Sequence, residues 1–281
     1  MADNRSLNPY RDPYTQIKHK LNPAVRFASV PEATIEKAHP KPAALDQGSI
    51  KVLSWNINKS TYEKGWIRDF SAIVKQYQPD KIFLQEMRLC ALSEEIPELS
   101  KIGWSFAPNF IDKAENTYSG VLIATKDNPV NSRALMTQHA EPIANTPKIS
   151  LFTKYALADG DESLLAVNTH LINFVALSKF EAQLEAIEAV LRTHQGKLIL
   201  AGDFNTWNRA RYAMLHRMTA RLKMTAVSFS SEDTRKIKSF LLSPPLDYIF
   251  YRGFRQKPLS AKVLDSFEAS DHNPLFVELC V

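Results

Sequence analysis

One short segment, residues 198–208, constrains the fold and function of this chain more than any other. The apolar run Leu198–Ala201 has the composition of a buried strand, and Gly202, Asp203 and Asn205 follow it closely. Side chains alternate between the faces of a strand, so the carboxylate of Asp203 and the carboxamide of Asn205 point the same way. The carboxylate can accept a proton or hold a cation, and the amide can donate to an anionic oxygen. A polar turn closing a core strand explains this segment alone equally well.

The same arrangement of an apolar run with a polar end recurs along the chain, which favours the functional interpretation. Strands are predicted over Ile50–Asn58, Lys81–Glu86, Ser119–Thr125, Ile149–Leu157, Ser163–His170, Lys197–Asp203, Leu246–Tyr251 and Leu275–Val281, with a hairpin turn at Asp159–Asp161. The polar groups at or near strand ends are Asn56, Glu86, His170, Asp203, Asn205 and Asp247, and Asp271 and His272 precede the last strand. Polar residues scattered at random would not gather so regularly after apolar runs.

Helical spacing of apolar residues predicts three helices between these strands. The first covers about Trp66–Tyr77, the second follows a capping-box pattern at Ser178 and Glu181, and the third covers 209–222. Strands that alternate with amphipathic helices predict an α/β fold.

The first 48 residues differ from the remainder in composition and in hydrophobic periodicity. They hold six of the 16 prolines and show no persistent helical or strand period. We predict an extended N-terminal arm over 1–48, with at most a short helix near Ala33–Lys37, before a catalytic domain over 49–281. The arm could lie across the domain or stay loose.

The composition is that of a globular protein rather than of a disordered or fibrous one. Hydrophobic residues make up 44% and charged residues 23%, as in globular enzymes, and the net charge of +5 is compatible with an anionic substrate. The two cysteines, Cys90 and Cys280, cannot make a disulfide framework, which fits a reducing compartment. There is no signal-peptide pattern and no apolar run near the ~18 residues of a membrane span, so we expect a cytoplasmic protein. A non-classical export signal would be invisible to this test.

If the strand ends meet on one rim of the sheets, that rim collects four carboxylates, two imidazoles and several carboxamides. Four carboxylates in one pocket repel one another unless a hard cation lies among them, and oxygen ligands favour Mg²⁺ or Mn²⁺. Two histidines add groups that titrate near neutrality. This combination is the equipment for hydrolysing a phosphate ester.

The ordered motifs resemble those of the endonuclease/exonuclease/phosphatase (DNase I-like) superfamily. They are Ser54-Trp55-Asn56, Leu84-Gln85-Glu86, Asn168-Thr169-His170-Leu171, Gly202-Asp203-Phe204-Asn205, Leu246-Asp247-Tyr248 and Ser270-Asp271-His272-Asn273-Pro274. His-x-x-Asn-Phe at 170–174 and Gly-Asp-Phe-Asn-x-Trp at 202–207 are most similar to the bacterial YafD-like branch. The resemblance implies a four-layer αββα sandwich, with two mixed, mainly antiparallel sheets between outer helices.

The resemblance also implies a role for each motif residue. Glu86, helped by Asn56 and Asp271, would hold the divalent metal. The catalytic groups would be His170, Asp203, Asn205, Asp247 and His272: Asp247 orients His272 toward the attacking water, Asp203 orients that water or serves the leaving group, and Asn205 donates to a phosphate oxygen. Asn173 matches a phosphate-contacting residue of the apurinic endonucleases in this superfamily.

Nucleic acid is the predicted substrate, because basic residues flank the motifs. The candidates for phosphate contacts are Arg209, Arg211, Arg235 and Lys236, although charge runs on helices are also common on solvated faces. A phospholipid or inositol-phosphate head-group hydrolase is the alternative, in which the loop Phe240–Leu242 would touch membrane; we favour this loop as core or a lid contact. A non-catalytic binding module with the same fold is a third possibility. The sequence names no protein partner.

Overall fold

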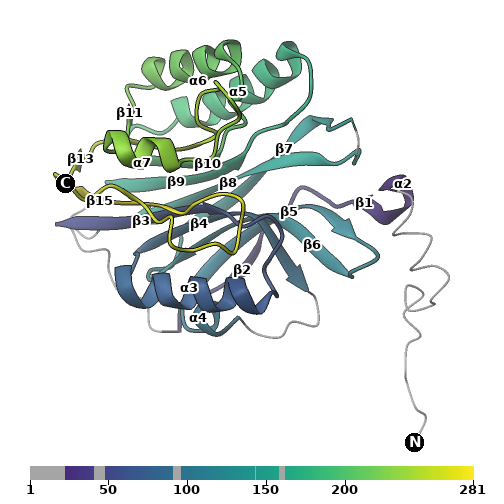
Figure 1. Ribbon diagram of the computed structural model, residues 1–281, viewed down its shortest axis with the longest axis horizontal. Helices are drawn as coiled ribbons and strands as arrows, with labels where there is room; N and C mark the ends of the chain where they lie inside the picture. The colour runs from purple at the N-terminus through teal and green to yellow at the C-terminus, as the bar shows by residue number, and fades with distance from the viewer. Residues whose placement is uncertain (1–22, 41–47, 91–95, 143, 158–161) are drawn as a thin grey trace, which may run out of the picture.

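Two β-sheets packed face to face form the centre of the molecule, and helices cover both outer surfaces (Figure 1). The computed structural model describes residues 23–40, 48–90, 96–142, 144–157 and 162–281. One core cluster joins the facing sheets. A second lies between one sheet and its helices, and a third lies between the other sheet and its helices. The predicted four-layer α/β sandwich is confirmed.

The first sheet has nine strands in the described part of the chain, ordered β1-β5-β6-β4-β3-β15-β13, with β2 on β5 and β14 on β15. Their bounds are β1 Phe27–Ser29, β2 Ile35–Lys37, β3 Ser49–Asn56, β4 Lys81–Cys90, β5 Gly103–Asp112, β6 Thr117–Thr125, β13 Arg255–Gln256, β14 Lys262–Val263 and β15 Leu275–Cys280. Only the β3–β4 pair is parallel among those described, so this sheet is mixed and mainly antiparallel.

The second sheet has six strands among the described residues, ordered β11-β12-β10-β9-β8-β7. Their bounds are β7 Asn131–Ala140, β8 Pro147–Ala156, β9 Ser163–His170, β10 Lys197–Asp203, β11 Thr225–Ala226 and β12 Asp247–Arg252. The central pair β9–β10 is parallel and the other pairs are antiparallel. Each sheet therefore contains one parallel pair, and Asn56, His170 and Asp203 lie at the ends of strands in these pairs.

The helices bury the apolar stripes that the sequence predicts. They are α2 Pro23–Arg26, α3 Lys64–Tyr77, α4 Pro97–Ser100, α5 Leu177–Arg192, α6 Arg209–Arg221 and α7 Ser231–Lys236. Trp66, Phe70 and Ile73 of α3 recur at helical spacing and are fully buried on the first sheet. α5 and α6 cover the second sheet at the top of Figure 1, with α3 and α4 below.

The described part of the N-terminal arm lies along the first sheet. β1 and β2 both pair antiparallel with β5, so the short helix predicted near Ala33–Lys37 is wrong: Ile35–Lys37 form a strand. The guanidinium of Arg26 donates three hydrogen bonds to the carboxylate of Asp112, the shortest 2.6 Å, and fixes β1 at the sheet edge. Long-range pairing thus decides the conformation of this segment.

Other local predictions need correction. The sequence pattern misses β5, whose Pro108 lies beside a register shift, and β7, an edge strand that is mostly half-exposed. α5 begins one residue before Ser178, and its N-cap position is Ala176, which has no side-chain acceptor, so the capping box is absent. The predicted turn at Asp159–Asp161 falls outside the described residues. No helix in the described ranges is long and apolar enough to cross a membrane.

Candidate active site

Three neighbouring strands of the second sheet align three functional residues in one row. Asp203 ends β10 and is paired in register with His170 at the end of the parallel strand β9. On its other side Asp203 is paired with Asp247, which begins the antiparallel strand β12. All three side chains are buried, and His170 Nε2 lies 3.5 Å from Asp203 Oδ2. The strand topology alone therefore brings together residues that lie far apart in the sequence.

Gly202 permits this close alignment. A Cβ atom at residue 202 would lie 1.9 Å from the carbonyl oxygen of Thr169, and its φ of +149° is rarely adopted by residues with a side chain. Glycine thus lets β10 approach β9 directly before Asp203. The Asp203 carboxylate then accepts the backbone N–H of Asn205 at 3.0 Å, which closes the turn predicted for this segment.

The parallel strands β3 and β4 of the first sheet supply the facing residues. Asn56 ends β3, and its Nδ2 donates to Asp203 Oδ2 at 2.9 Å, which joins the two sheets at the site. Glu86 lies in a register shift of β4 between Leu84 and Met87, with φ of +54°. A bulge of this kind re-aims a side chain, and it directs the Glu86 carboxylate into the same cleft.

A buried amide network holds the two sheets in register beside the site. Gln85 Nε2 donates to Asn168 Oδ1 at 2.7 Å, and Asn168 Nδ2 donates to the carbonyl oxygens of Leu84 and Leu122. Gln85 precedes Glu86, and Asn168 lies two residues before His170, so the network fixes both strands that carry them.

His272 reaches the site on the loop before β15. The loop is tied to β3 because Trp55 Nε1 donates to the carbonyl oxygen of His272 at 2.8 Å, and Ser270 Oγ donates to the carbonyl oxygen of Asn56 at 2.7 Å. His272 Nδ1 lies 2.8 Å from Asp247 Oδ2. This contact leaves His272 Nε2 as the ring nitrogen that does not face Asp247, and the catalytic role of the pair stays a prediction.

These residues line one cleft with a volume of about 320 Å³. Asp247 does not line the cleft but is hydrogen-bonded to His272, which does. The predicted residues that line it are Asn56, Glu86, His170, Asn173, Asp203, Asn205, Asp271 and His272. Five of the eleven non-glycine residues with positive φ in the described chain also line it: Asn58, Lys59, Glu86, Phe174 and Asn205. Strained backbone of this kind concentrates at functional sites.

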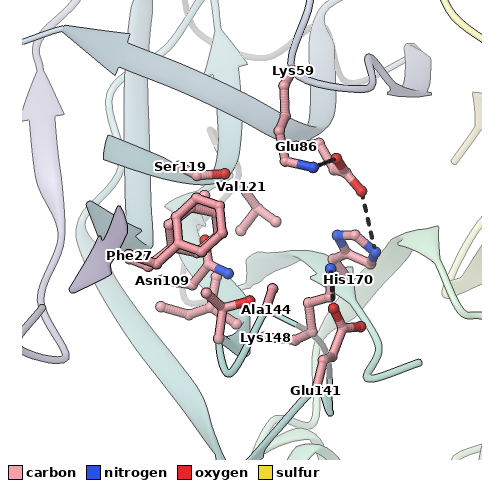
Figure 2. A pocket seen from close by; sticks show the side chains of 14 residues that line it. Phe27, Lys59, Glu86, Asn109, Ser119, Val121, Glu141, Ala144, Lys148 and His170 are labelled. Carbon is pink, nitrogen blue, oxygen red and sulfur yellow. Dashed lines mark ion pairs between the residues drawn. The ribbon is translucent and has the colours of Figure 1, made fainter. Parts of the chain in front are cut away.

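Basic neighbours keep Glu86 ionised. Burial alone would raise its pKa, but Lys59, Lys148 and His170 together hold the pKa of Glu86 well below its usual range. Lys59 Nζ forms an ion pair with Glu86 Oε2 at 2.6 Å (Figure 2). Burial, together with the charge of Lys148, lowers the pKa of His170 to about 4, although Asp203 and Glu86 oppose the change. His170 is therefore neutral at pH 7.

In the cluster of Asp203, Asp247 and His272 the pKa shifts run the other way: the pKa of the acid Asp203 and that of His272 are both raised. Burial raises the pKa of Asp203; nearby His170 lowers it and Asp247 raises it again. Burial lowers the pKa of His272, but its contact with Asp247 outweighs burial and the pKa rises to about 9. At neutral pH His272 is therefore an imidazolium held between carboxylates.

The cleft can hold a cation. One oxygen or nitrogen atom from each of Asp203, Asp247 and His272 lies within 4.8 Å of the others, and the carboxylate of Glu86 faces the same space. A carboxylate whose pKa is raised by burial gains most from a cation placed beside it, and oxygen donors suit hard divalent ions. The carboxylate and amide oxygens of the cleft thus fit a divalent metal, whereas His272 can be a ligand only when its imidazole is neutral.

Two of the predicted substrate-contacting residues do not reach the cleft. Arg211 is fully buried, and its guanidinium donates to the carbonyl oxygens of Ile172, Asn205 and Val175, so it supports the loops behind the site. Lys236 Nζ forms ion pairs with Glu232 and Asp265. Burial makes Arg211 a structural residue, which contradicts its assignment to substrate binding, whereas the assignment of partly exposed Lys236 stays a prediction.

The other residues predicted to bind substrate or metal lie at different distances from the cleft. Arg209 and Arg235 are exposed but do not line the cleft. Asn173 lines it, and its Oδ1 accepts Trp207 Nε1 at 2.8 Å, which leaves Nδ2 to donate. Asp271 lies at the rim and pairs with Lys238 at 2.9 Å. The loop Phe240–Leu242 is exposed, with Leu241 at 93% and Leu242 at 98%, so it is not core, and the alternative of a lid contact stays a prediction.

Two lysines form a basic side of the site that the sequence patterns do not single out. Lys59 and Lys148 line both the cleft and an adjoining side pocket of about 80 Å³, which Figure 2 shows together with Phe27 of the arm. Lys148 also pairs with Glu141 at 3.4 Å. Only their positions in the sequence could have indicated these lysines. Lys59 follows the polar end of the first predicted strand, and Lys148 immediately precedes the strand predicted over Ile149–Leu157.

Comparison with known proteins defines the class. Residues 53–272 match the model of the "Endonuclease/Exonuclease/phosphatase family", so the chain belongs to this family, whose members hydrolyse phosphate esters. Its curated relatives are UPF0294 (YafD-like) proteins; the one from Vibrio campbellii is 33% identical over 240 residues, which cover 84% of this chain and 80% of the relative.

Solved structures show the same fold at low sequence identity. The human Nocturnin catalytic domain with bound sulfate anion is 18% identical, with a TM-score of 0.61, over 88% of this chain and 97% of that one. D. rerio TDP2 complexed with single strand DNA product is 14% identical, with a TM-score of 0.54, over 83% of this chain and 99% of that one. Both likenesses support the DNase I-like sandwich.

Proposed function

We propose that this chain is a divalent-metal-dependent phosphodiesterase that cleaves nucleic acid. One observation carries the proposal: the His272–Asp247 pair and the carboxylates of Asp203 and Glu86 converge in a single cleft that also contains lysines. The acidic groups suit a cation and proton transfer, and the lysines suit a substrate with repeated negative charge.

The cation would be held by Glu86, with Asn56 and Asp271 in the same cleft as further oxygen donors. When bound, Mg²⁺ or Mn²⁺ neutralises phosphate charge and makes phosphorus more susceptible to attack. Asn56 already donates to Asp203 through Nδ2 and accepts the N–H of Asn58 through Oδ1, so its amide is fixed in orientation.

The proton-transfer groups have distinct roles. His272 is protonated at neutral pH by virtue of its raised pKa, and a nearby cation favours its neutral form, in which Nε2 can take a proton from the attacking water. Asp203, whose pKa is raised, can hold a proton for the leaving oxygen. Neutral His170 and the remaining N–H of the Asn205 amide can donate hydrogen bonds to phosphate oxygens.

Three lysines along the cleft favour nucleic acid over a small phosphate ester. Lys59, Lys148 and Lys238 all line it, each paired with an acid of the chain, and contact of these lysines with several phosphates would add salt-dependent affinity. The TDP2 structure with a single-stranded DNA product provides a precedent for such a substrate on this fold.

A lipid head-group phosphodiesterase is the second candidate, because Phe240, Leu241 and Leu242 are exposed next to the cleft. Exposed apolar residues in a row are suited to contact with a membrane surface.

Substrate profiling tests both candidates. Purified protein should be incubated with single- and double-stranded DNA, RNA, sphingomyelin and phosphoinositides, with Mg²⁺, Mn²⁺ or EDTA. We expect cation-dependent cleavage of at least one nucleic acid. Lipid turnover without cleavage of any nucleic acid would replace the first candidate by the second, and no turnover of any substrate would point to a binding module.

A further inference from the structure

Phe174 is an exposed aromatic residue at the mouth of the cleft. It lines the cleft together with Asn173 and Asp203, yet its exposed fraction is 62%. Its φ is +51°, a conformation that a bulky residue adopts only where its surroundings impose it. Burial of the side chain therefore does not explain the cost of holding Phe174 in this position.

A chain of planar groups connects Phe174 to the interior. The ring of Trp207 lies 6.5 Å from that of Phe174 at an interplanar angle of 31°. The guanidinium of Arg211 lies 5.0 Å from the centre of the Trp207 ring and 4.5 Å from the Phe180 ring. Phe180 and Arg211 are fully buried, so the chain of contacts begins in rigid core and ends in solvent at the active cleft.

Hydrogen bonds fix the members of this chain. Arg211 is held by three backbone carbonyl oxygens, and Trp207 Nε1 donates to Asn173 Oδ1 at 2.8 Å. Asn173 itself donates its backbone N–H to Glu141 Oε1 at 2.9 Å. The same Asn173 Oδ1 accepts the N–H of Phe174. The backbone that carries the ring, and the Trp207 ring beside it, are thus held in place before any ligand arrives.

We propose that Phe174 is a stacking platform for a nucleobase of the substrate, on a nucleotide adjoining the scissile phosphate. This inference rests on the proposed function and identifies the substrate as nucleic acid with unpaired bases. It also explains the Phe of the 170–174 motif and the Trp of the 202–207 motif, to which catalysis assigns no role.

The surroundings favour a base over an acyl chain. Asn173, Glu141 and Asn205 line the cleft beside the ring, so a bound apolar chain would strip water from polar groups without replacing their hydrogen bonds. A nucleobase stacks its face on the ring and keeps its polar edges for these groups or for water. Stacking on one open ring tolerates any base, so we expect little sequence preference.

Equilibrium binding tests this assignment without requiring catalysis. The probes are two fluorescent single strands of equal length in EDTA, one with normal bases and one with abasic units throughout. Fluorescence anisotropy gives the ratio of their affinities for the wild-type chain and for Phe174→Leu, Phe174→Trp and the remote, partly buried control Phe229→Leu.

We expect the wild-type chain to favour the base-bearing strand by about 5- to 150-fold, the range that stacking of one base provides. Phe174→Leu should lose most of that ratio, whereas Phe174→Trp and Phe229→Leu should retain it. An unchanged ratio in Phe174→Leu, or a wild-type chain without preference for bases, overturns the platform. Tighter binding of all variants to lipid vesicles than to either strand would also overturn it.

Cleavage assays with Mn²⁺ separate this inference from the proposed function. Cleavage of the base-bearing strand with an unchanged affinity ratio would leave the nuclease assignment standing and remove the platform. A ratio that depends on Phe174 without cleavage of any strand would support the platform and remove the nuclease assignment.

Discussion

Replacing Asp247 by Asn isolates the electrostatic contact on which the proposed proton transfer depends. Burial lowers the pKa of His272, and the charge and hydrogen bond of Asp247 reverse this and raise it from 6.5 to about 9. Asparagine keeps the size and one acceptor of the side chain but removes the charge. With burial then largely unopposed, the pKa of His272 should fall toward or below its ordinary value.

The size of the effect on stability follows from the difference between the pKa values of His272 in the folded and unfolded states. Each unit of pKa difference between the folded and unfolded states corresponds to about 1.4 kcal/mol, so a rise from 6.5 to about 9 stabilises the wild-type fold by about 3 kcal/mol. Because the folded pKa is raised, this stabilisation is fully present below pH 6.5 and is lost as pH rises through about 9. In Asp247→Asn it should be largely absent at every pH.

The assay is urea denaturation of both proteins between pH 6 and 9.5 in EDTA, with the imidazole pKa followed by NMR. Lys81 also titrates in this range, because burial lowers its pKa to about 8, and its contribution has the opposite sign. That contribution is common to both proteins and cancels in their difference. Parallel curves, with a difference that changes by less than about 0.5 kcal/mol across the range, would refute the reasoning.

Further substitutions test the remaining assignments. His272→Ala should lower the rate of phosphodiester cleavage at least ~10²-fold with an unchanged circular dichroism spectrum; a wild-type rate removes it from the mechanism. Arg211→Met should lower the free energy of unfolding by about 3 kcal/mol or more, because three buried carbonyl oxygens lose their donor, whereas exposed Arg209→Met should stay within about 0.5 kcal/mol in urea titrations. Gly202→Ala should give an unstable or insoluble protein, whereas Gly65→Ala, where a Cβ meets nothing within 4 Å, should match or exceed the wild-type melting temperature.

The sequence predicts those features that depend on local pattern. The three long helices follow from apolar residues at helical spacing, and the strands that carry Asn56, Glu86, His170 and Asp203 follow from apolar runs with polar ends. Such strands are buried on both faces, which is why continuous hydrophobic runs mark them. Their convergence then follows from parallel pairing, which places strand ends of the same sense side by side.

Features that depend on long-range contacts could not be predicted in the same way. β2 is a strand because β5 offers it an edge, although its short sequence carries no strand pattern. Arg211 looks like one member of a basic helix surface, but its position in α6 turns it toward the loops at Ile172 and Val175. Spacing along one helix shows which residues share a face, and only the packing of that helix shows which face is buried.

The balance of charge across the cleft connects the fold to its proposed chemistry. Glu86 stays ionised because Lys59 and Lys148 face it, and Asp247 is matched by the imidazolium of His272. Glu86 and Asp247 therefore have cationic partners within the chain, whereas buried Asp203 contacts the amide of Asn56 and the neutral imidazole of His170. Glu86 is the carboxylate that would hold the proposed cation, and it would then be shared with Lys59, whose Nζ lies 2.6 Å away and could face an anionic substrate. Positive charge in the cleft would also favour the neutral form of His272, which is the form that can accept a proton.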